Sequence, residues 1–244
     1  MEHENLKIRA IIFDVYATLL QVGAPPSDAD GQWNKLFENV LGEPAPLSRF
    51  DFSVRTQQVI AQRHAAARSR GIQWPEISWP SVVVEVLPAL EGVAEKELEE
   101  FIFRQMQIGR SLRLMLHAGE FLCALRERGK LLGIASNSQR YTLRELSEAL
   151  RGAGLNLSIF EPDLCFWSFQ NGFSKPDPYV FQILTARLEA RGISARETLM
   201  IGDRPDNDIE PARAHGWQTW QLLAAGMGDG ESTGDFRQLL VKLA

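Results

Sequence analysis

The sequence predicts an α/β protein with a Rossmann-like parallel β-sheet, interrupted after its first strand by a mostly helical insertion. Three observations lead to this prediction. An apolar, β-branched run at residues 8–13 ends in Asp14, as a buried parallel strand does. From about residue 117 onward, strand and helix patterns alternate, which indicates a parallel sheet covered by helices. Between these parts, residues 21–114 show helical spacing without strand alternation.

The insertion begins with the breaker-rich stretch VGAPPSDADG and continues with amphipathic helical runs near 33–41, 53–70 and 96–109. We therefore predict a core formed by residues 1–20 and 115–244, and a helical cap domain formed by residues 21–114. An insertion at this point would lie over the carboxyl end of the sheet, where it could cover a site around Asp14.

After the insertion, predicted helices and strands alternate to the end of the chain. Strands are predicted at 130–136, 164–169, 198–203 and 217–223. Helices are predicted at 119–129, 136–150, 175–192, 206–216 and 236–243. Gly129 suits the end of the first of these helices, and Ser136 or Ser138 suits the N-cap of the second. Lys175 opens the third, where prolines suit a first helical turn.

Polar residues follow four of the predicted strands, at the points where the strands end. They are, in chain order, Asp14, the pair Ser136 and Asn137, Lys175 and Asp203. Because the carboxyl ends of parallel strands meet at one edge of a sheet, we expect these side chains to converge.

The residue types suit the binding of a cation and an anion side by side. Asp14 and Asp203 offer hard oxygen ligands of the kind that Mg²⁺ binds. Ser136 and Asn137, with the N–H groups of the helix that follows, form a candidate anion site. Lys175 adds a positive charge that favours the ionised form of Asp14. Such a site could support attack by a carboxylate and a covalent Asp intermediate.

Two further residues are expected to support this site. Asp208 could orient Lys175 or a metal-bound water. Thr18 could brace the turn after Asp14 through its hydroxyl.

Composition and charge limit the classes of partner. The chain has 244 residues, a formal charge of −5 and 45% hydrophobic residues, so we expect a soluble protein without a nucleic-acid partner. No membrane span is evident. Cys123 and Cys165 lie in apolar stretches without metal-ligand spacing, and we interpret them as reduced residues of a cytoplasmic protein.

The segments IIFDVYATL, GIASN, KPDP and MIGDRPDNDI resemble, in this order, the four motifs of the haloacid dehalogenase (HAD) superfamily of hydrolases. The insertion resembles that superfamily's C1-type cap. The resemblance implies that Asp14 is the nucleophile and a Mg²⁺ ligand. It also implies that the backbone carbonyl of Tyr16 and the carboxylate of Asp203 bind the metal, and that Ser136 and Lys175 bind the transferring group.

Tyr16 departs from the pattern of the phosphatases in this superfamily. These enzymes usually carry a second Asp at this position, which protonates the leaving oxygen. A phenol with a pKa of about 10 is a poor replacement at pH 7. The loss of general acid–base help typically costs about 10²–10⁴-fold in rate. The pattern D-x-Y-x-T-L resembles instead the 2-haloacid dehalogenases, whose halide leaves without a proton.

The fourth motif favours a phosphatase, because dehalogenases work without a metal and carry a motif that resembles S-S-N-x-x-D. Asp203 beside Asp14 would be a repulsive pair without a cation. We therefore predict Mg²⁺-dependent hydrolysis of a small phosphorylated metabolite, with an acid supplied by His64 or made unnecessary by an acyl phosphate. A dehalogenase and a catalytically weakened binding protein stay as alternatives. Phosphonoacetaldehyde hydrolases also lack the second Asp, but Lys35 and Lys96 stand in no convincing context for their Schiff base.

Overall fold

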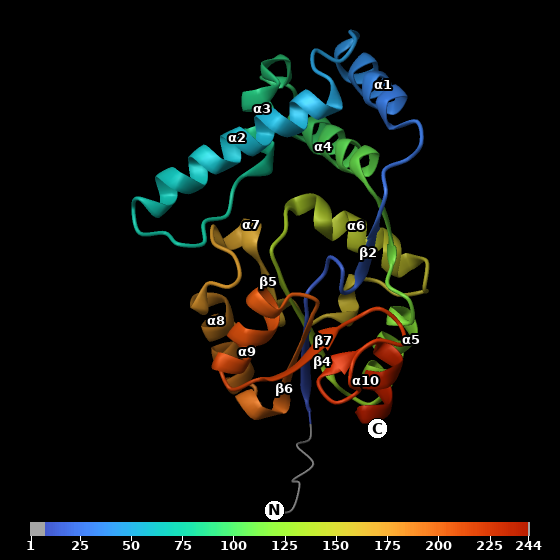
Figure 1. Cartoon of the computed structure of the whole chain (residues 1–244), viewed down its shortest axis with the longest axis vertical. Coiled ribbons are helices and arrows are strands. Elements are labelled where there is room, and N and C mark those ends of the chain that lie inside the picture. Colours follow the sequence, from blue (N-terminus) through green and yellow to red (C-terminus); the bar gives the residue numbers. More distant parts are fainter. Residues whose placement is uncertain (1–7, 244) are drawn as a thin grey trace, which may run out of the picture.

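The computed structural model describes residues 8–243, which form a parallel sheet, two helical layers on its faces and a helical segment above one edge (Figure 1). The sheet has six strands in the order β5-β4-β1-β6-β7-β8, and every neighbouring pair is parallel. The strands are β1 (Ala10–Phe13), β4 (Leu131–Ser136), β5 (Cys165–Trp167), β6 (Thr198–Gly202), β7 (Gln218–Leu222) and β8 (Thr233–Gly234).

The first strand lies in the middle of the sheet because both of its faces are apolar. Side chains of a strand alternate between the two faces. Ile11 and Phe13 belong to the hydrophobic cluster on one face, while Ala10 and Ile12 belong to the cluster on the other. A strand buried on both faces needs partners on both edges, and β1 pairs with β4 and β6.

Helices cover both faces of the sheet, as Figure 1 shows. Residues of α5, α6 and α10 pack in the cluster that contains Phe13, and residues of α8 and α9 pack in the other. The helices of the core are α5 (Ala118–Glu127), α6 (Arg140–Arg151), α7 (Ser168–Asn171), α8 (Pro178–Glu189), α9 (Glu210–Ala214) and α10 (Phe236–Lys242). A π-helical turn, Pro205–Ile209, precedes α9.

Residues 24–110, which we call the cap segment, lie above the edge of the sheet at which its parallel strands end (Figure 1). Their helices are α1 (Ala29–Leu41), α2 (Arg49–Arg68), α3 (Trp79–Val86) and α4 (Glu95–Gly109). The predicted helices at 33–41, 53–70 and 96–109 are confirmed as parts of α1, α2 and α4, whereas α3 was not predicted. The division into a core and a cap domain stays our prediction.

The cap segment has a hydrophobic cluster of its own. Phe37 and Phe101 are fully buried in it, with their ring centroids 5.1 Å apart and their planes at 84°. Such edge-to-face pairs stabilise a core beyond the area they bury. The buried members of this cluster all come from the cap segment, and Tyr141 of α6 packs against them.

A short antiparallel ribbon joins the cap segment to the core. β2 (Leu20–Gly23) pairs with β3 (Ser111–Leu114), so both connecting strands run side by side. The sequence did not predict this ribbon, since four-residue strands with half-exposed side chains show no alternation that stands out from a loop.

Some predicted boundaries are wrong by a few residues. The strand expected at 164–169 ends at Trp167, where α7 begins. Lys175 does not open a helix: it lies in the loop before α8, whose N-cap is Asp177. The side chain of Asp177 accepts a hydrogen bond from the N–H of Tyr179, which fixes the helix start. Among the described residues, no helix combines the length and the apolar character that crossing a bilayer requires.

Candidate active site

Asp14 directly follows the central strand, and its position is fixed by the sheet. Its backbone N–H donates to the carbonyl of Ile201 in β6 over 2.9 Å. The residue is 9% exposed, so the carboxylate faces a nearly dry environment. The prediction that the carboxyl end of the first strand delivers a buried carboxylate is thereby confirmed.

Lys175 binds two carboxylates at once. Its Nζ lies 2.7 Å from Oδ1 of Asp14 and 2.5 Å from Oδ1 of Asp208, and all three residues are almost fully buried. Burial acts to lower the pKa of Lys175, but the two carboxylates outweigh it and raise the pKa above its usual value. Lys175 therefore stays charged and holds both carboxylates in place.

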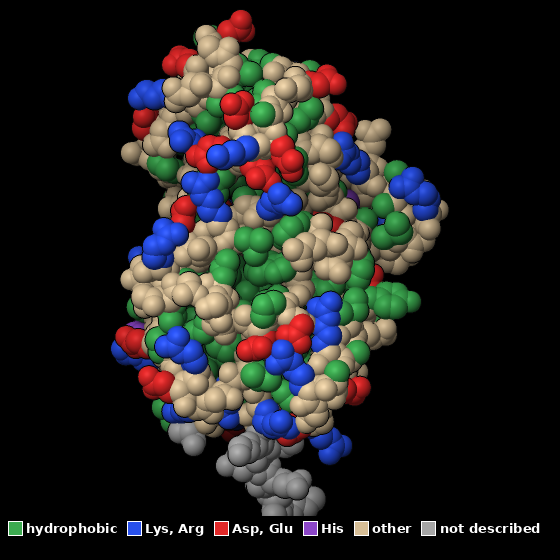
Figure 2. All heavy atoms as spheres, turned by 180° about the vertical axis from the view of Figure 1, so that it is seen from behind, with side chains coloured by type: hydrophobic (Ala, Val, Ile, Leu, Met, Phe, Trp, Pro, Cys, Tyr) green, Lys and Arg blue, Asp and Glu red, His purple; other side chains and the backbone are tan. Residues whose placement is uncertain are grey.

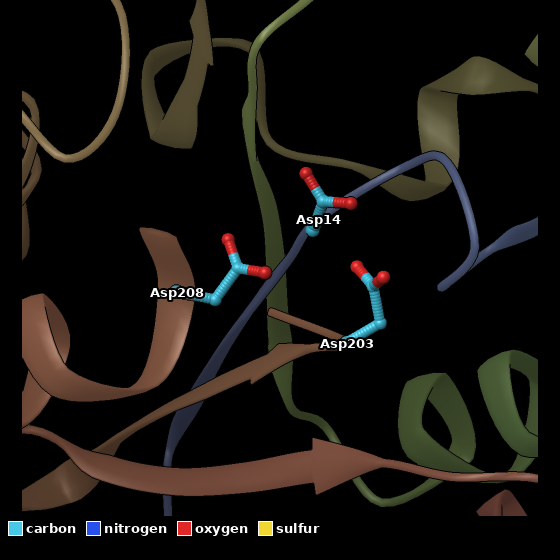
Figure 3. Close-up of side chains that lie close together, drawn as sticks. All are labelled: Asp14, Asp203 and Asp208. Atoms are coloured by element: carbon cyan, nitrogen blue, oxygen red, sulfur yellow. The ribbon is translucent and has the colours of Figure 1, made fainter. Parts of the chain in front are cut away.

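Asp203, at the end of β6, completes an acidic cluster with Asp14 and Asp208. One oxygen from each of the three carboxylates lies within 4.8 Å of the other two (Figure 3). Burial raises the pKa of Asp14 to about 6, with further increases from Asp208 and Asp203 and an opposing effect of Lys175. Burial and the charge of Asp208 also raise the pKa of Asp203.

This donor set fits a magnesium ion. The cluster holds three carboxylates, and the ammonium group of Lys175 pairs with only two of them, so the ionised cluster carries an excess negative charge in a poorly solvated place. Carboxylate oxygens are the ligands that Mg²⁺ takes in proteins. Asp14 and Asp203 are the residues that would hold the ion, because both carboxylate oxygens of Asp208 are already engaged, Oδ1 by Lys175 and Oδ2 by the N–H of Arg204.

Gly202, directly before Asp203, leaves the room that Asp208 occupies. A Cβ at Gly202 would lie 2.4 Å from Cγ and Oδ2 of Asp208. Sequence reasoning did not identify this role, although the Gly-Asp pair at the end of a strand was visible.

Ser136 and Asn137 end β4 next to Lys175, but their side chains are used differently. Ser136 is fully buried, and its hydroxyl has no hydrogen-bond partner among the described residues. Such an unpaired buried hydroxyl is costly unless a ligand completes it. The side-chain Nδ2 of Asn137 donates to the backbone carbonyl of Lys175 over 2.9 Å. Its Oδ1 accepts from the backbone N–H of Lys175 over 2.7 Å. Its side chain therefore positions Lys175, and its contact with a substrate stays a prediction.

The start of the helix after these residues differs from our expectation. α6 begins at Arg140 with Gln139 as the N-cap, instead of Ser136 or Ser138. Ser138 is engaged elsewhere: its hydroxyl donates to the carbonyl of Ser136, and its backbone N–H donates to Ser168 Oγ over 2.8 Å, which anchors the loop to α7.

The Tyr16 hydroxyl is held in a buried polar cluster. It lies 2.7 Å from Thr142 Oγ1, donates to Glu145 over 2.5 Å and accepts from Arg110 over 2.8 Å. The Arg110 guanidinium also lies 4.4 Å from the centre of the Tyr16 ring. Burial raises the pKa of Tyr16 far above its usual value, and Glu145 raises it further against the effect of Arg110. The phenol is thus an even weaker acid than the sequence suggested.

Sequence reasoning missed Arg110 and Glu145. A signal for Glu145 existed, since α6 buries Thr142, Glu145, Leu146 and Leu150 on one face. A carboxylate on a buried helical face demands a partner. Arg110 gave no such signal, because its partners lie far away in the sequence.

The turn after Asp14 is held by the main chain. Thr18 is buried, but its hydroxyl has no partner among residues 8–243, so the predicted bracing by this hydroxyl is wrong. The N–H groups of Thr18 and Leu20 donate to the carbonyl of Val15 instead. Ala17 adopts a left-handed backbone conformation, with φ of 58°, and this conformation lets the chain reverse tightly enough to form these bonds.

Two cavities adjoin the boundary between the cap segment and the core. The larger, of about 660 Å³, is lined by both apolar and charged side chains, with Gln139, Tyr141 and Phe169 on the core side. Figure 2 shows hydrophobic side chains gathered in a hollow between the two parts. His64 lines the smaller cavity, of about 350 Å³, which contains none of the three aspartates in its wall. Its predicted role as an acid stays a prediction.

Comparisons with known proteins agree on one family. The model of the haloacid dehalogenase-like hydrolases matches residues 8–216. A phosphoserine phosphatase of Thermus thermophilus is 33% identical over 156 residues, which make up 63% of this chain and 58% of the relative. The match thus spans little more than half the length of that relative.

Two solved structures show the same fold over nearly the whole chain. A HAD hydrolase of Bacillus subtilis, bound to magnesium, is 22% identical with a TM-score of 0.55, and the match covers 97% of this chain and 99% of that one. An L-2-haloacid dehalogenase is 19% identical with a TM-score of 0.56, again over 97% and 99% of the two chains. At these identities the likeness shows the fold alone.

Proposed function

The chain belongs to the haloacid dehalogenase-like hydrolases, and we propose that it is a Mg²⁺-dependent phosphatase acting on a small phosphorylated metabolite. One observation carries this proposal: Asp14, Asp203 and Asp208 form one cluster, in which a single lysine pairs with two of the three carboxylates. A site with this charge excess suits a divalent cation and, beside it, a dianionic group.

The residues have distinct roles in this proposal. Asp14 is the nucleophile, and its carboxylate forms a covalent bond to the phosphorus while the ester oxygen leaves. Lys175 and the unpaired hydroxyl of Ser136 bind the phosphoryl oxygens. Asp14, Asp203 and the backbone carbonyl of Tyr16 would hold Mg²⁺. When bound, the ion offsets the negative charge that would otherwise keep a phosphate away from a carboxylate.

Two comparisons support the choice within the family. The relative that is 33% identical is a phosphoserine phosphatase, and a similarly folded hydrolase was solved with magnesium bound. The fold of the dehalogenases is equally close and does not discriminate between the two reactions.

Tyr16 limits the leaving groups that such an enzyme can expel. Its phenol is committed to Glu145 and Arg110, and its raised pKa makes proton donation at pH 7 ineffective. We expect acyl and aryl phosphates to react faster than alkyl phosphates, because their leaving oxygens need little protonation.

A 2-haloacid dehalogenase is the second candidate, and Tyr16 is the observation that favours it. Halide departure needs no acid, so a tyrosine at this position would not impair such a reaction. Against it stands the acidic cluster, in which Asp203 would repel both Asp14 and the carboxylate of a haloacid.

The proposed location is the cytoplasm, and the proposed substrate is a small anion. Cys123 and Cys165 are unpaired, as in a reducing compartment.

A substrate screen with and without Mg²⁺ tests the proposal. Acyl, aryl and alkyl phosphates and 2-haloacids are offered to the wild type and to Asp14→Asn, whose amide is not a competent nucleophile. We expect turnover of phosphates that stops in EDTA and in the variant. Turnover of haloacids at full rate in EDTA would establish the dehalogenase reaction instead. A folded protein that turns over neither class would point to a binding function.

A further inference from the structure

The loop between α2 and α3 of the cap segment is bound to the core next to Lys175. The N–H of Glu76 donates to the carbonyl of Gly172 over 3.0 Å, and the N–H of Ser174 donates to the carbonyl of Trp74 over 2.9 Å. Pro75 and Phe173 face each other between these bonds as an antiparallel bridge. We call residues 74–79 the docking loop.

Gln139 binds the same docking loop from a second core segment. Its Nε2 donates to the carbonyl of Ile77 over 2.9 Å and to Glu76 Oε1 over 3.0 Å, and its Oε1 accepts from the N–H of Trp79 over 3.2 Å. Gln139 is 9% exposed. The side chain thus makes three hydrogen bonds to the docking loop of the cap segment.

The two core segments under the docking loop are tied to each other and to the acidic cluster. Gln139 stands three residues after Ser136, and Asn137 between them binds the backbone of Lys175 at both ends of its amide. Lys175 in turn binds Asp14 over 2.7 Å. A displacement of the docking loop would therefore reach Ser136 and Lys175 through short, directional contacts.

Two ion pairs between the cap segment and the core are more exposed than the contacts of Gln139. Arg140 pairs with Glu99 over 2.6 Å and Arg144 with Glu100 over 2.5 Å, but these side chains are 40% exposed or more. Such ion pairs are screened by solvent and add little. Gln139 differs because a buried amide that loses its partners is left unsatisfied.

We propose that Gln139 is a positioning residue: it couples the docking loop to the two core segments that carry Ser136 and Lys175, so that their geometry depends on the docked cap segment. The inference rests on the proposed function in one respect, since the reaction supplies one of its readouts. The other readout, amide hydrogen exchange, does not depend on any reaction.

The test exchanges donor and acceptor across the contact. Gln139→Glu keeps the shape and the acceptor for the Trp79 N–H, but it removes both donated bonds and sets a carboxylate against Glu76. Glu76→Gln in the same protein supplies an amide that can donate to the new carboxylate. A purely local role of Gln139 within its own helix would not be rescued by a change in the cap segment.

Gln182→Glu is the matched control, because it makes the same chemical change on an exposed position of α8. We expect it to behave as the wild type in both readouts.

In the ligand-free protein, we expect Gln139→Glu to speed exchange of the Glu76 and Ser174 amides, and the double variant to slow it again. For the best phosphate substrate of the screen, we expect kcat to fall by about 10- to 100-fold in the single variant, and to recover by about fivefold or more in the double variant. The loss should appear in kcat, since Ser136 and Lys175 act on the transferring group.

Three results would overturn the inference: unchanged exchange in Gln139→Glu, faster exchange with an unchanged kcat, or a loss confined to KM. If the screen finds no phosphatase activity but the exchange of both segments responds as described, the proposed function fails while the coupling itself is supported.

Discussion

At the scale of single residues, the behaviour of the site depends on charges that are buried together. The cluster contains three carboxylates, which carry three negative charges when all are ionised. Lys175 supplies one positive charge against them. Burial raises the pKa of Asp14 to about 6 and also that of Asp203. The metal-free cluster is therefore under electrostatic strain that a bound cation would relieve.

Asp203→Ala should abolish Mg²⁺ binding without destabilising the metal-free protein. The substitution removes a ligand, but it also removes a like charge beside Asp208. Calorimetric titration should show one divalent site in the wild type and none in the variant. At about 100 times its Kd, Mg²⁺ should add about 2.7 kcal/mol to the free energy of unfolding of the wild type only. Asp206→Ala is the control, since Asp206 is exposed and its carboxylate pairs with Arg204 instead of the cluster; a loss of binding there would contradict the assignment.

Tyr16→Asp should alter the preference among leaving groups. A carboxylate there could protonate a leaving alkoxide, so turnover of alkyl phosphates should rise by up to about 10²-fold and that of aryl phosphates by less. A dehalogenase would instead lose activity on 2-haloacids, because a second carboxylate repels the substrate. Steady-state kinetics on matched alkyl and aryl phosphates give the ratio.

Tyr16→Phe distinguishes the effect of a new acidic group at this position from the effect of losing the tyrosine hydroxyl. It keeps the ring under Arg110 but leaves Glu145 and Thr142 without their shared partner, which should lower the free energy of unfolding by about 1–3 kcal/mol. The leaving-group preference should stay that of the wild type. An equal gain on alkyl phosphates in both variants would show that proton donation is not the cause.

At the scale of elements, the turn between β6 and α9 places two aspartates within reach of Asp14. Asp203 leaves the strand directly, and Asp208 returns from the π-helical turn Pro205–Ile209. The return is close only because Gly202 has no side chain, and a Cβ there would overlap Asp208. The turn can therefore bring Asp208 this close only if residue 202 is a glycine.

Gly202→Ala should displace Asp208 from Lys175. Overpacking of this kind costs about 1–3 kcal/mol in the free energy of unfolding. We also expect a marked loss of turnover, since Lys175 would lose one of its two anchors. Thermal unfolding and kcat are the measurements. Gly109→Ala, at the end of α4 with open space around its Cβ, should change neither by much; equal effects of the two substitutions would contradict the steric argument.

Some of these elements could be predicted from the sequence and others could not, and the difference has physical reasons. The buried strands at Asp14, Ser136 and Asp203 were predictable, because continuous apolar runs that end in polar residues are a local signal. The ribbon of β2 and β3 was not, since its strands are short and its pairing joins residues about ninety positions apart. The cluster of Tyr16, Arg110 and Glu145 was equally hidden, because only the folded chain brings its members together.

At the scale of the whole molecule, apolar side chains form separate clusters. Two cover the faces of the sheet, and a third lies within the cap segment around Phe37 and Phe101. Polar contacts such as those of Gln139 and Arg140 connect the cap segment to the core. Parts that bury their apolar surface independently can lose structure independently.

Phe37→Ala should therefore loosen the cap segment and spare the sheet. Truncation of a buried phenylalanine costs about 3–5 kcal/mol. Segment-resolved hydrogen exchange should show faster exchange in α1 and α4, with β1 and β4 as protected as in the wild type. Phe50→Ala is the control, because Phe50 is 76% exposed on α2. Uniform loss of protection through the whole chain would show that the molecule unfolds as one cooperative unit.

The paired ribbon has a consequence for how such a protein can diversify. The chain leaves the core at Leu20 and returns at Leu114, and these two residues are direct partners in the ribbon. All residues between Leu20 and Leu114 thus form the loop of one β-hairpin. The entropic cost of closing a loop grows only slowly with the length of the loop. A different helical segment could be transplanted onto the same two strands without altering the sheet. Along the chain, the strands that carry Asp14 and Asp203 and the segment above them are thus connected through this one ribbon.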